Sequence, residues 1–208
     1  MKGNTQVRHM LRSITIAVSL VLAFCISPVA AYPPGQPLTV SLTPDMIIAK
    51  TGKTKLNIAK AKPSTNISIK IGAKSSSTKS SAAGGISKIL SGYTSGIYNI
   101  SVRTPVYPDV ADEVKTVVLY VPSVTAPKSG KISAKTLVKL KFVKPGTIIT
   151  LAPKAGKKAK KTITVKLSSK ANSATVTIPA KTFIKGATNT FVLSVGKAFK
   201  TTYKFTGK

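Results

Sequence analysis

The sequence has no tryptophan, and it is poor in the side chains that most catalytic sites use. Its 208 residues include four acidic residues, one histidine (His9) and one cysteine (Cys25). Acid–base and nucleophilic catalysis near neutral pH depend mainly on histidine, carboxylates, cysteine and perturbed lysine or tyrosine. A zinc site needs imidazole or thiolate ligands, and no glycine-rich phosphate loop precedes a helix. The sequence therefore predicts a protein that is not an enzyme, with no cofactor and no small-molecule substrate.

The composition does not exclude one catalytic arrangement, a Ser-Lys or Thr-Lys dyad. Two short runs supply the residue types, Ser77-Thr78-Lys79 and Ser168-Ser169-Lys170. Both runs are typical of turns, and no supporting motif accompanies either of them. An enzyme is therefore the third hypothesis, behind the two binding hypotheses given below.

Three of the four acidic residues gather in one loop, which extends from Pro105 to Glu113. Asp109, Asp112 and Glu113 supply oxygen ligands of the kind that calcium takes. The loop lacks the Asp-x-Asp-x-Asp-Gly pattern of a calcium loop. We expect these carboxylates to be solvated or paired with nearby lysines, with a cation at this loop as the alternative.

Basic residues outnumber acidic ones by 33 to 4, for a formal net charge of +29. The imbalance grows along the chain. Residues 32–122 contain 11 basic and 4 acidic residues (11 − 4 = +7), whereas residues 123–208 contain 19 lysines and no other charged side chain (+19). A field of this sign attracts polyanions such as nucleic acid, anionic lipid or acidic wall polymers. Solubility alone is the simpler interpretation of the same charge.

The first 31 residues have the pattern of a secretory signal peptide. A basic start precedes an apolar run from Ile14 to Ile26, and small residues follow up to Ala31. The run has 13 residues, and a membrane span needs roughly 20. Cleavage after Ala31 leaves Tyr32 as the new N-terminus, whereas an uncleaved leader would attach the chain to a membrane. We expect a secreted, extracellular protein at the cell surface, without disulfides because Cys25 lies in the leader.

Beyond the leader, apolar and polar residues alternate in short segments with turn residues between them. This pattern predicts antiparallel β-sandwiches and no long helix. We place a first domain at residues 32–122, a proline-bounded linker at 123–128 and a lysine-rich second domain at 129–208. Strands are predicted at residues 38–42, 55–58, 67–71, 86–90, 98–102, 117–121, 138–142, 163–167, 175–178, 191–195 and 200–205, with at most one weak edge strand within 72–85.

An eight-residue run occurs twice in the chain, 82 positions apart. Lys62 to Ile69 reads KPSTNISI, and Lys144 to Leu151 reads KPGTIITL. In both copies Pro63 or Pro145 is expected to set a turn, and the residues after it to enter a core strand. Residues 98–102 match 191–195, and the strand at 115–116 matches 200–205 more weakly. These matches predict two related structural units.

The phenylalanines of the second unit lie on the apolar phase of their strands. We expect Phe142, Phe191 and Phe205 to be core residues. With no tryptophan in the chain, an aromatic platform for carbohydrate is not predicted.

Lysines in the strands mostly take the polar phase, where their ammonium groups reach water. The densest cluster, Gly156 to Lys161, is expected at a hairpin tip. It supplies a candidate polyanion contact, formed by Lys154, Lys157, Lys158, Lys160 and Lys161, with a solvated turn as the alternative. After the leader Arg103 is the only arginine, so nucleic-acid binding would be nonspecific and weakened by salt.

Three segments resemble a known group of proteins. The segment from Tyr32 to Val40 (YPPGQPLTV), the Lys-Pro-x-Thr runs and the strand from Gly96 to Val102 (GIYNISV) resemble secreted bacterial surface proteins with tandem immunoglobulin-like repeats. In that family a Gly-x-Tyr-x-Val-x-Val-like strand lies near the end of each repeat, and Tyr98, Ile100 and Val102 fit it. The resemblance implies tandem immunoglobulin-like β-sandwiches and a structural or adhesive surface role. It supplies no catalytic residues.

Two functional hypotheses follow. The first is a non-catalytic surface or cell-wall-associated protein with a structural or adhesive role, held by attraction of its lysines to anionic envelope polymers or bound to other surface proteins. The alternative is an extracellular protein whose task is nonspecific binding of polyanions or DNA. Contact with a membrane is expected only through an uncleaved leader.

Overall fold

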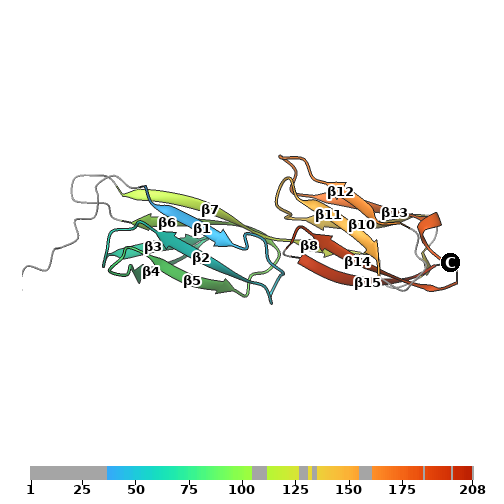
Figure 1. The fold of residues 1–208 in the computed structure, drawn as a ribbon, viewed down its shortest axis with the longest axis horizontal. Helices are drawn as coiled ribbons and strands as arrows, with labels where there is room; N and C mark the ends of the chain where they lie inside the picture. Colours follow the sequence, from blue (N-terminus) through green and yellow to red (C-terminus); the bar gives the residue numbers. More distant parts are fainter. Residues whose placement is uncertain are drawn as a thin grey trace, which may run out of the picture. The chain divides into compact units, whose positions relative to one another are not determined.

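The computed structural model describes residues 37–104, 112–126, 131–132, 135–154, 161–184, 186–197 and 199–207. Within these residues the chain is nearly all β and forms two antiparallel sandwiches (Figure 1). The predicted leader and its cleavage site at Ala31 and Tyr32 lie outside the described residues. In the described part of the chain, no helix is long and apolar enough to cross a membrane.

The first sandwich consists of a three-stranded and a four-stranded sheet. The first sheet has the order β1-β2-β5, and the second has the order β4-β3-β6-β7. The strands are β1 (Thr39–Thr43), β2 (Lys53–Ala59), β3 (Asn66–Ile71), β4 (Lys74–Lys79), β5 (Ile86–Ser91), β6 (Gly96–Thr104) and β7 (Glu113–Val121). All six strands that the alternation predicts in this part of the chain are present. The weak strand predicted within residues 72–85 is β4, which lies at a sheet edge.

The second sandwich repeats this plan with one addition. One sheet has the order β13-β10-β8, and the other has the order β12-β11-β14-β15-β9, with β9 parallel to β15. The strands are β8 (Ser123–Thr125), β9 (Lys131–Ile132), β10 (Lys135–Lys141), β11 (Ile148–Pro153), β12 (Ile163–Lys166), β13 (Ala174–Pro179), β14 (Thr188–Val195) and β15 (Phe199–Gly207). A 3-10 turn, η1 (Ala180–Thr182), follows β13. Strand β8 occupies the start of the stretch predicted as a linker at 123–128.

The strand order is that of an immunoglobulin-like sandwich. In the first unit the first, second and fifth strands pair in one sheet, and the third, sixth and seventh pair in the other with the fourth at its edge. In the second unit β8, β10 and β13 take the places of β1, β2 and β5, while β12, β11, β14 and β15 take those of β4, β3, β6 and β7. This distribution of strands between two packed antiparallel sheets defines the immunoglobulin-like class. The predicted fold class is confirmed.

The duplicated eight-residue run occupies equivalent places in the two sandwiches. The first copy leads from β2 into β3, and the second copy leads from β10 into β11. The residue after each proline has a positive φ, 55° at Ser64 and 75° at Gly146. Proline followed by a left-handed residue is the pattern of a type II turn, so the predicted turn is present in both copies. Residues 98–102 and 191–195, which match in sequence, likewise lie in equivalent strands, β6 and β14.

Backbone hydrogen bonds extend this equivalence beyond the run itself. Ala61 N donates to Gly84 O at 2.9 Å, and 82 residues later Val143 N donates to Asn172 O at the same distance. Ala61 and Val143 are both fully buried. The same loop therefore closes over the same end of each core.

Phe142 departs from the predicted alternation. It has a φ of 60° and is only half-buried, whereas the next residue, Val143, is fully buried. The equivalent residue of the first sandwich, Lys60, also has a positive φ, of 64°. The left-handed residue breaks the period of two after β10, so the core position passes from Phe142 to Val143. The prediction of Phe142 as a core residue is wrong, and those of Phe191 and Phe205 are confirmed.

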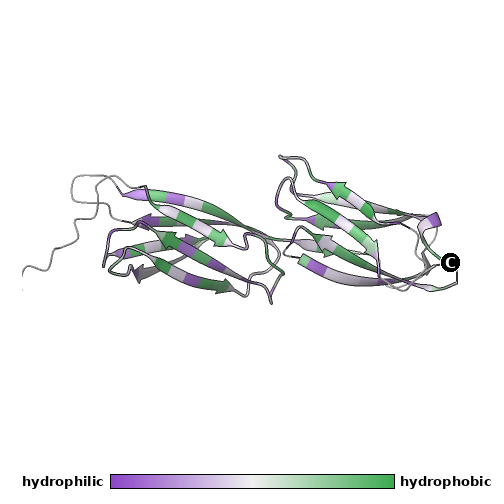
Figure 2. Cartoon of the chain, viewed as in Figure 1, coloured by the Kyte–Doolittle hydropathy of each residue, from purple (hydrophilic) through white to green (hydrophobic). Residues whose placement is uncertain are grey.

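Hydrophilic and hydrophobic residues alternate along the strands of both sandwiches (Figure 2). Each sandwich has its own hydrophobic core, formed by the buried apolar residues of its two sheets. The first core is aliphatic and includes Leu56, Ile67, Ile69, Ile100, Val102 and Leu119. The second contains Val138, Leu140, Ile149, Leu151, Leu193 and Val195 around Phe191 and Phe205, together with Met46 from the segment after β1.

Candidate functional site

The predicted lysine cluster lies at the connection between β11 and β12. Lys154 directly follows β11, Lys161 precedes β12, and both are exposed. The two strands are consecutive in the chain and pair antiparallel, with Leu151 opposite Ile163, so β11 and β12 form a β-hairpin. Lys157, Lys158 and Lys160 lie outside the described residues. The structure therefore places two of the five predicted contact residues at one end of the five-stranded sheet.

Three further lysines lie on the outer face of the same sheet. Phe205 and Leu151 of its strands are buried in the core, so residues one position away along each strand point outward. The outward lysines are Lys166 on β12 and Lys200 and Lys204 on β15, and all three are exposed. We call these three residues together with Lys154 the lysine face.

Strand register brings Lys154 and Lys204 to the same end of the face, although 50 positions separate them in the sequence (204 − 154 = 50). Lys154 N donates to Thr190 O at 2.9 Å, and Thr190 on β14 is the register partner of Lys204 on β15. Neighbouring strands are about 4.8 Å apart, so the two lysine backbones lie roughly 10 Å apart across the sheet. Lys200 lies four residues from Lys204 along β15, which is about 13 Å.

Between the lysines the face carries small side chains. Thr150 and Ala152 on β11 face outward beside Ser194 and Val192 on β14, and all four are half-buried. Thr164 on β12 and Thr202 on β15 continue these rows and are exposed. Ile148 is the large apolar residue of the face, with 51% of its surface exposed. The described part of the face is therefore rich in hydroxyls and carries no aromatic ring.

The alternation in the sequence predicts Lys166, Lys200 and Lys204 on the polar phase of their strands, but it does not connect them with the predicted cluster. Their phase is visible in the alternation of lysine with Ile163, Val165, Tyr203 and Phe205. The strand order β12-β11-β14-β15 is a tertiary property, and it decides which lysines share a surface.

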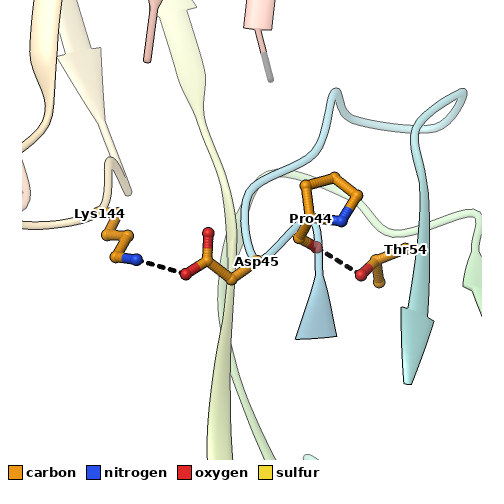
Figure 3. Close-up of polar contacts among 4 residues, drawn as sticks. All are labelled: Pro44, Asp45, Thr54 and Lys144. Carbon is orange, nitrogen blue, oxygen red and sulfur yellow. Dashed lines mark hydrogen bonds and ion pairs between the residues drawn. The ribbon is translucent and has the colours of Figure 1, made fainter. Parts of the chain in front are cut away.

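The acidic residues that the structure describes all have basic partners. Asp112 pairs with Arg103, at 2.5 Å from the Asp112 Oδ2 to the Arg103 Nε, and Glu113 pairs with Lys115 at 3.2 Å. Glu113 Oε2 also accepts a hydrogen bond from Leu38 N at 2.8 Å. Asp45, in the segment after β1, pairs with Lys144 of the second Lys-Pro-x-Thr run (Figure 3).

These ion pairs bear on the calcium alternative at the acidic loop. Asp109 lies outside the described residues. Asp112 and Glu113 form the ion pairs with Arg103 and Lys115 described above. Among the residues with described positions, no three His, Cys, Asp or Glu side chains gather as metal ligands would.

The two candidate Ser-Lys runs have different local structures. Ser77, Thr78 and Lys79 lie in the edge strand β4, so the prediction that they form a turn is wrong. β4 is exposed along nearly its whole length and consists of Ser, Thr and Lys, so it lacks the alternation of apolar and polar residues that predicts a strand. Ser168 to Lys170 does form a turn, with Ala171 N donating to Ser168 O at 3.3 Å.

Two tyrosines have shifted ionisation. Burial raises the pKa of Tyr203, whose ring stacks on that of Phe205 with a centroid distance of 6.2 Å. Burial, and to a lesser degree the neighbouring Tyr98, raises the pKa of Tyr93. Tyr203 lies on the inward side of β15, behind the lysine face.

No family model and no curated protein matches this sequence. Solved structures with similar folds include the human OSCAR ligand-binding domain, at 12% identity and a TM-score of 0.39, covering 82% of this chain and 96% of that one. The D0-D1 domain of intimin matches at 15% identity and a TM-score of 0.33, covering 82% and 98%. A calcium-stabilised adhesin with which an Antarctic bacterium binds ice matches at 12% identity and a TM-score of 0.33 over 84% of this chain, which spans 49% of that protein.

Proposed function

We propose that this chain is a non-catalytic, exported surface protein of structural or adhesive role, held at the cell envelope by attraction between its lysines and anionic polymers. The proposal takes the leader, the tandem sandwiches and the charge together. Its main support is the distribution of charge. Each described acidic residue is in an ion pair, and no acidic residue follows Glu113. The surplus positive charge of the second sandwich therefore faces solvent without acidic side chains of its own to balance it.

A salt wash of cells that express the protein tests ionic retention. Exposed charges more than a Debye length apart are largely screened, and that length falls from about 30 Å at 0.01 M salt to about 3 Å at 1 M. The protein should stay with the cells at low salt and be released between about 0.1 and 1 M NaCl. Retention at molar salt, or absence from cells at low salt, would contradict the proposal.

The alternative function is nonspecific binding of extracellular DNA, which the same charge also favours. It predicts salt-dependent DNA binding by the full chain, with an affinity that does not vary with sequence. Titration of fluorescent duplexes of unrelated sequence measures both properties. Failure of DNA to bind at 50 mM salt would reject the alternative and leave envelope retention standing.

A further inference from the structure

The lysine face is a basic surface that the strand register of the second sandwich builds from residues distant in sequence. We propose that this face, on the outer side of β12-β11-β14-β15, is the binding site for a linear phosphodiester polymer that carries no bases, such as a poly(polyol phosphate) chain. This inference rests on the proposed function and deepens it. It assigns the retention to one face and names the class of polymer.

The four lysines are spread over the face rather than clustered at one point. Lys154 and Lys204 lie at one end, Lys166 pairs in register with Ile148 at the opposite end, and Lys200 lies opposite Ser194. Strand spacing and rise place Lys204 roughly 10 Å from Lys154 and about 13 Å from Lys200, with Lys166 farther away across the face. Flexible lysine side chains several ångströms long can then reach several phosphates of one extended chain at the same time. A compact anion would meet only one or two of them.

Small side chains cover the part of the sheet that lies between the lysines. Thr150, Ala152, Val192 and Ser194 are short, so a chain can approach the sheet closely between the lysines. The hydroxyls of Thr164 and Thr202 are exposed and can donate hydrogen bonds to phosphate oxygens. A sheet backbone holds these groups at fixed spacings, which a mobile tail of lysines would not.

The residue types of the face favour one class of polyanion. Proteins that bind single-stranded nucleic acid place aromatic rings where the bases can stack, and specific duplex readout favours arginine. The described part of the face presents neither, since Phe191, Tyr203 and Phe205 point toward the core. Lysine ammonium groups and hydroxyls recognise phosphate charge, which a base-free phosphodiester chain supplies throughout.

A charge-matched pair of variants separates this face from charge in general. The face variant replaces Lys154, Lys166, Lys200 and Lys204 with glutamine. The control variant replaces Lys139, Lys141, Lys170 and Lys181 with glutamine, and all four of these lysines are exposed and lie outside the face. Both variants lose four positive charges from the second sandwich, so their net charges are equal.

Binding of each full-length protein to poly(glycerol phosphate) is measured by titration between 25 and 200 mM NaCl. Each phosphate contact contributes about 0.7 to the slope of log K against log salt for a flexible chain, so loss of four contacts should lower the slope by roughly 3. We expect the face variant to lose about tenfold or more in affinity at low salt, and the control variant less than about threefold.

The outcomes separate the two levels of the proposal. Equal losses in both variants would overturn the assignment to this face while leaving ionic retention intact. No binding by the unmodified protein at 25 mM salt would overturn the proposed function as well. Binding of single-stranded DNA more tightly than poly(glycerol phosphate) at matched phosphate concentration would overturn the base-free preference. All eight substitutions are at exposed positions, so both variants are expected to fold. Circular dichroism and thermal melting check this.

Discussion

At the residue scale, one backbone position in each Lys-Pro-x-Thr turn must take a left-handed conformation. The first sandwich has Ser64 there and the second has Gly146. Non-glycine residues pay about 1 to 2 kcal/mol for this conformation, whereas glycine takes it freely. A Cβ on Gly146 would meet no atom within 4 Å, so torsional strain alone decides the effect of a side chain there.

We therefore expect opposite effects from two substitutions at these equivalent positions. Gly146→Ala should lower the free energy of unfolding by about 1 kcal/mol. Ser64→Gly should raise it by about 0.5 kcal/mol, because relief of the strain exceeds the extra entropy that glycine loses on folding. Chemical denaturation of each variant measures both changes. Destabilisation by both substitutions would show that the side chain of Ser64 contributes more than its backbone strain costs.

Tyr203 provides a pH-dependent prediction. Its pKa is raised above the ordinary value of 10.0 because burial favours the neutral phenol. The unfolded chain therefore loses this proton at a lower pH than the folded chain. The resulting stabilisation is present below about pH 10 and is lost as pH rises through the folded-state pKa.

The Tyr203→Phe variant removes this ionisation and leaves every lysine in place. Its loss of stability between about pH 9 and about pH 11 should be smaller than that of the unmodified protein, even if the two differ at pH 7. Thermal melting across this pH range measures both slopes. Identical slopes would mean that burial of this phenol does not contribute to alkaline unfolding.

At the element scale, β14 and β15 serve the core and the surface at the same time. Their inward residues include Phe191 and Phe205, whose ring centroids are 6.1 Å apart, while Phe183 meets Phe191 edge to face at 5.7 Å. Their outward residues include Lys200 and Lys204. The alternation of an extended strand therefore couples the rigidity of the core to the positions of the lysines.

Phe191→Ala should destabilise the protein by about 3 to 5 kcal/mol, because it removes a fully buried ring and leaves a cavity among close-packed neighbours. Thr202→Ala, on the outer side of β15, is the matched control and should change stability by about 0.5 kcal/mol or less. Denaturant titration compares the two variants. A change below about 1 kcal/mol for Phe191→Ala would mean that the core can collapse around the lost ring.

At the scale of the whole molecule, the net charge of +29 acts on stability as well as on binding. Like charges on a compact surface repel, which destabilises the folded state relative to an expanded chain. Salt shortens the Debye length from about 30 Å at 0.01 M to about 8 Å at 0.15 M and so weakens this repulsion.

The melting temperature should therefore rise when NaCl increases from 10 to 150 mM. The rise should be smaller in the two four-lysine variants, because each has lost four positive charges. Calorimetry at constant pH measures these shifts, with urea denaturation as a check on the trend. A melting temperature that falls with salt would indicate that the ion pairs of Asp45, Asp112 and Glu113 outweigh the repulsion.

The sequence by itself determined the fold class, because alternation and turn chemistry are local properties. Pro63 and Pro145 predicted their turns, and the alternation around Ile67 and Leu193 predicted core strands, since a period of two leaves one face for the core. The exceptions are also local in origin. At Phe142 a left-handed residue shifts the phase, and at β4 the polar composition predicts only a weak edge strand and gives Ser77 to Lys79 the pattern of a turn.

Only the tertiary structure decided which lysines share a surface. Lys154, Lys166, Lys200 and Lys204 come from three segments of the chain, and sheet order and register bring them onto one face. Hydrogen bonding between strands distant in sequence sets that order, and a local pattern of alternation contains no information about which strand becomes the neighbour. The sequence therefore predicted a basic protein, whereas the arrangement of β12, β11, β14 and β15 gave that charge a definite surface.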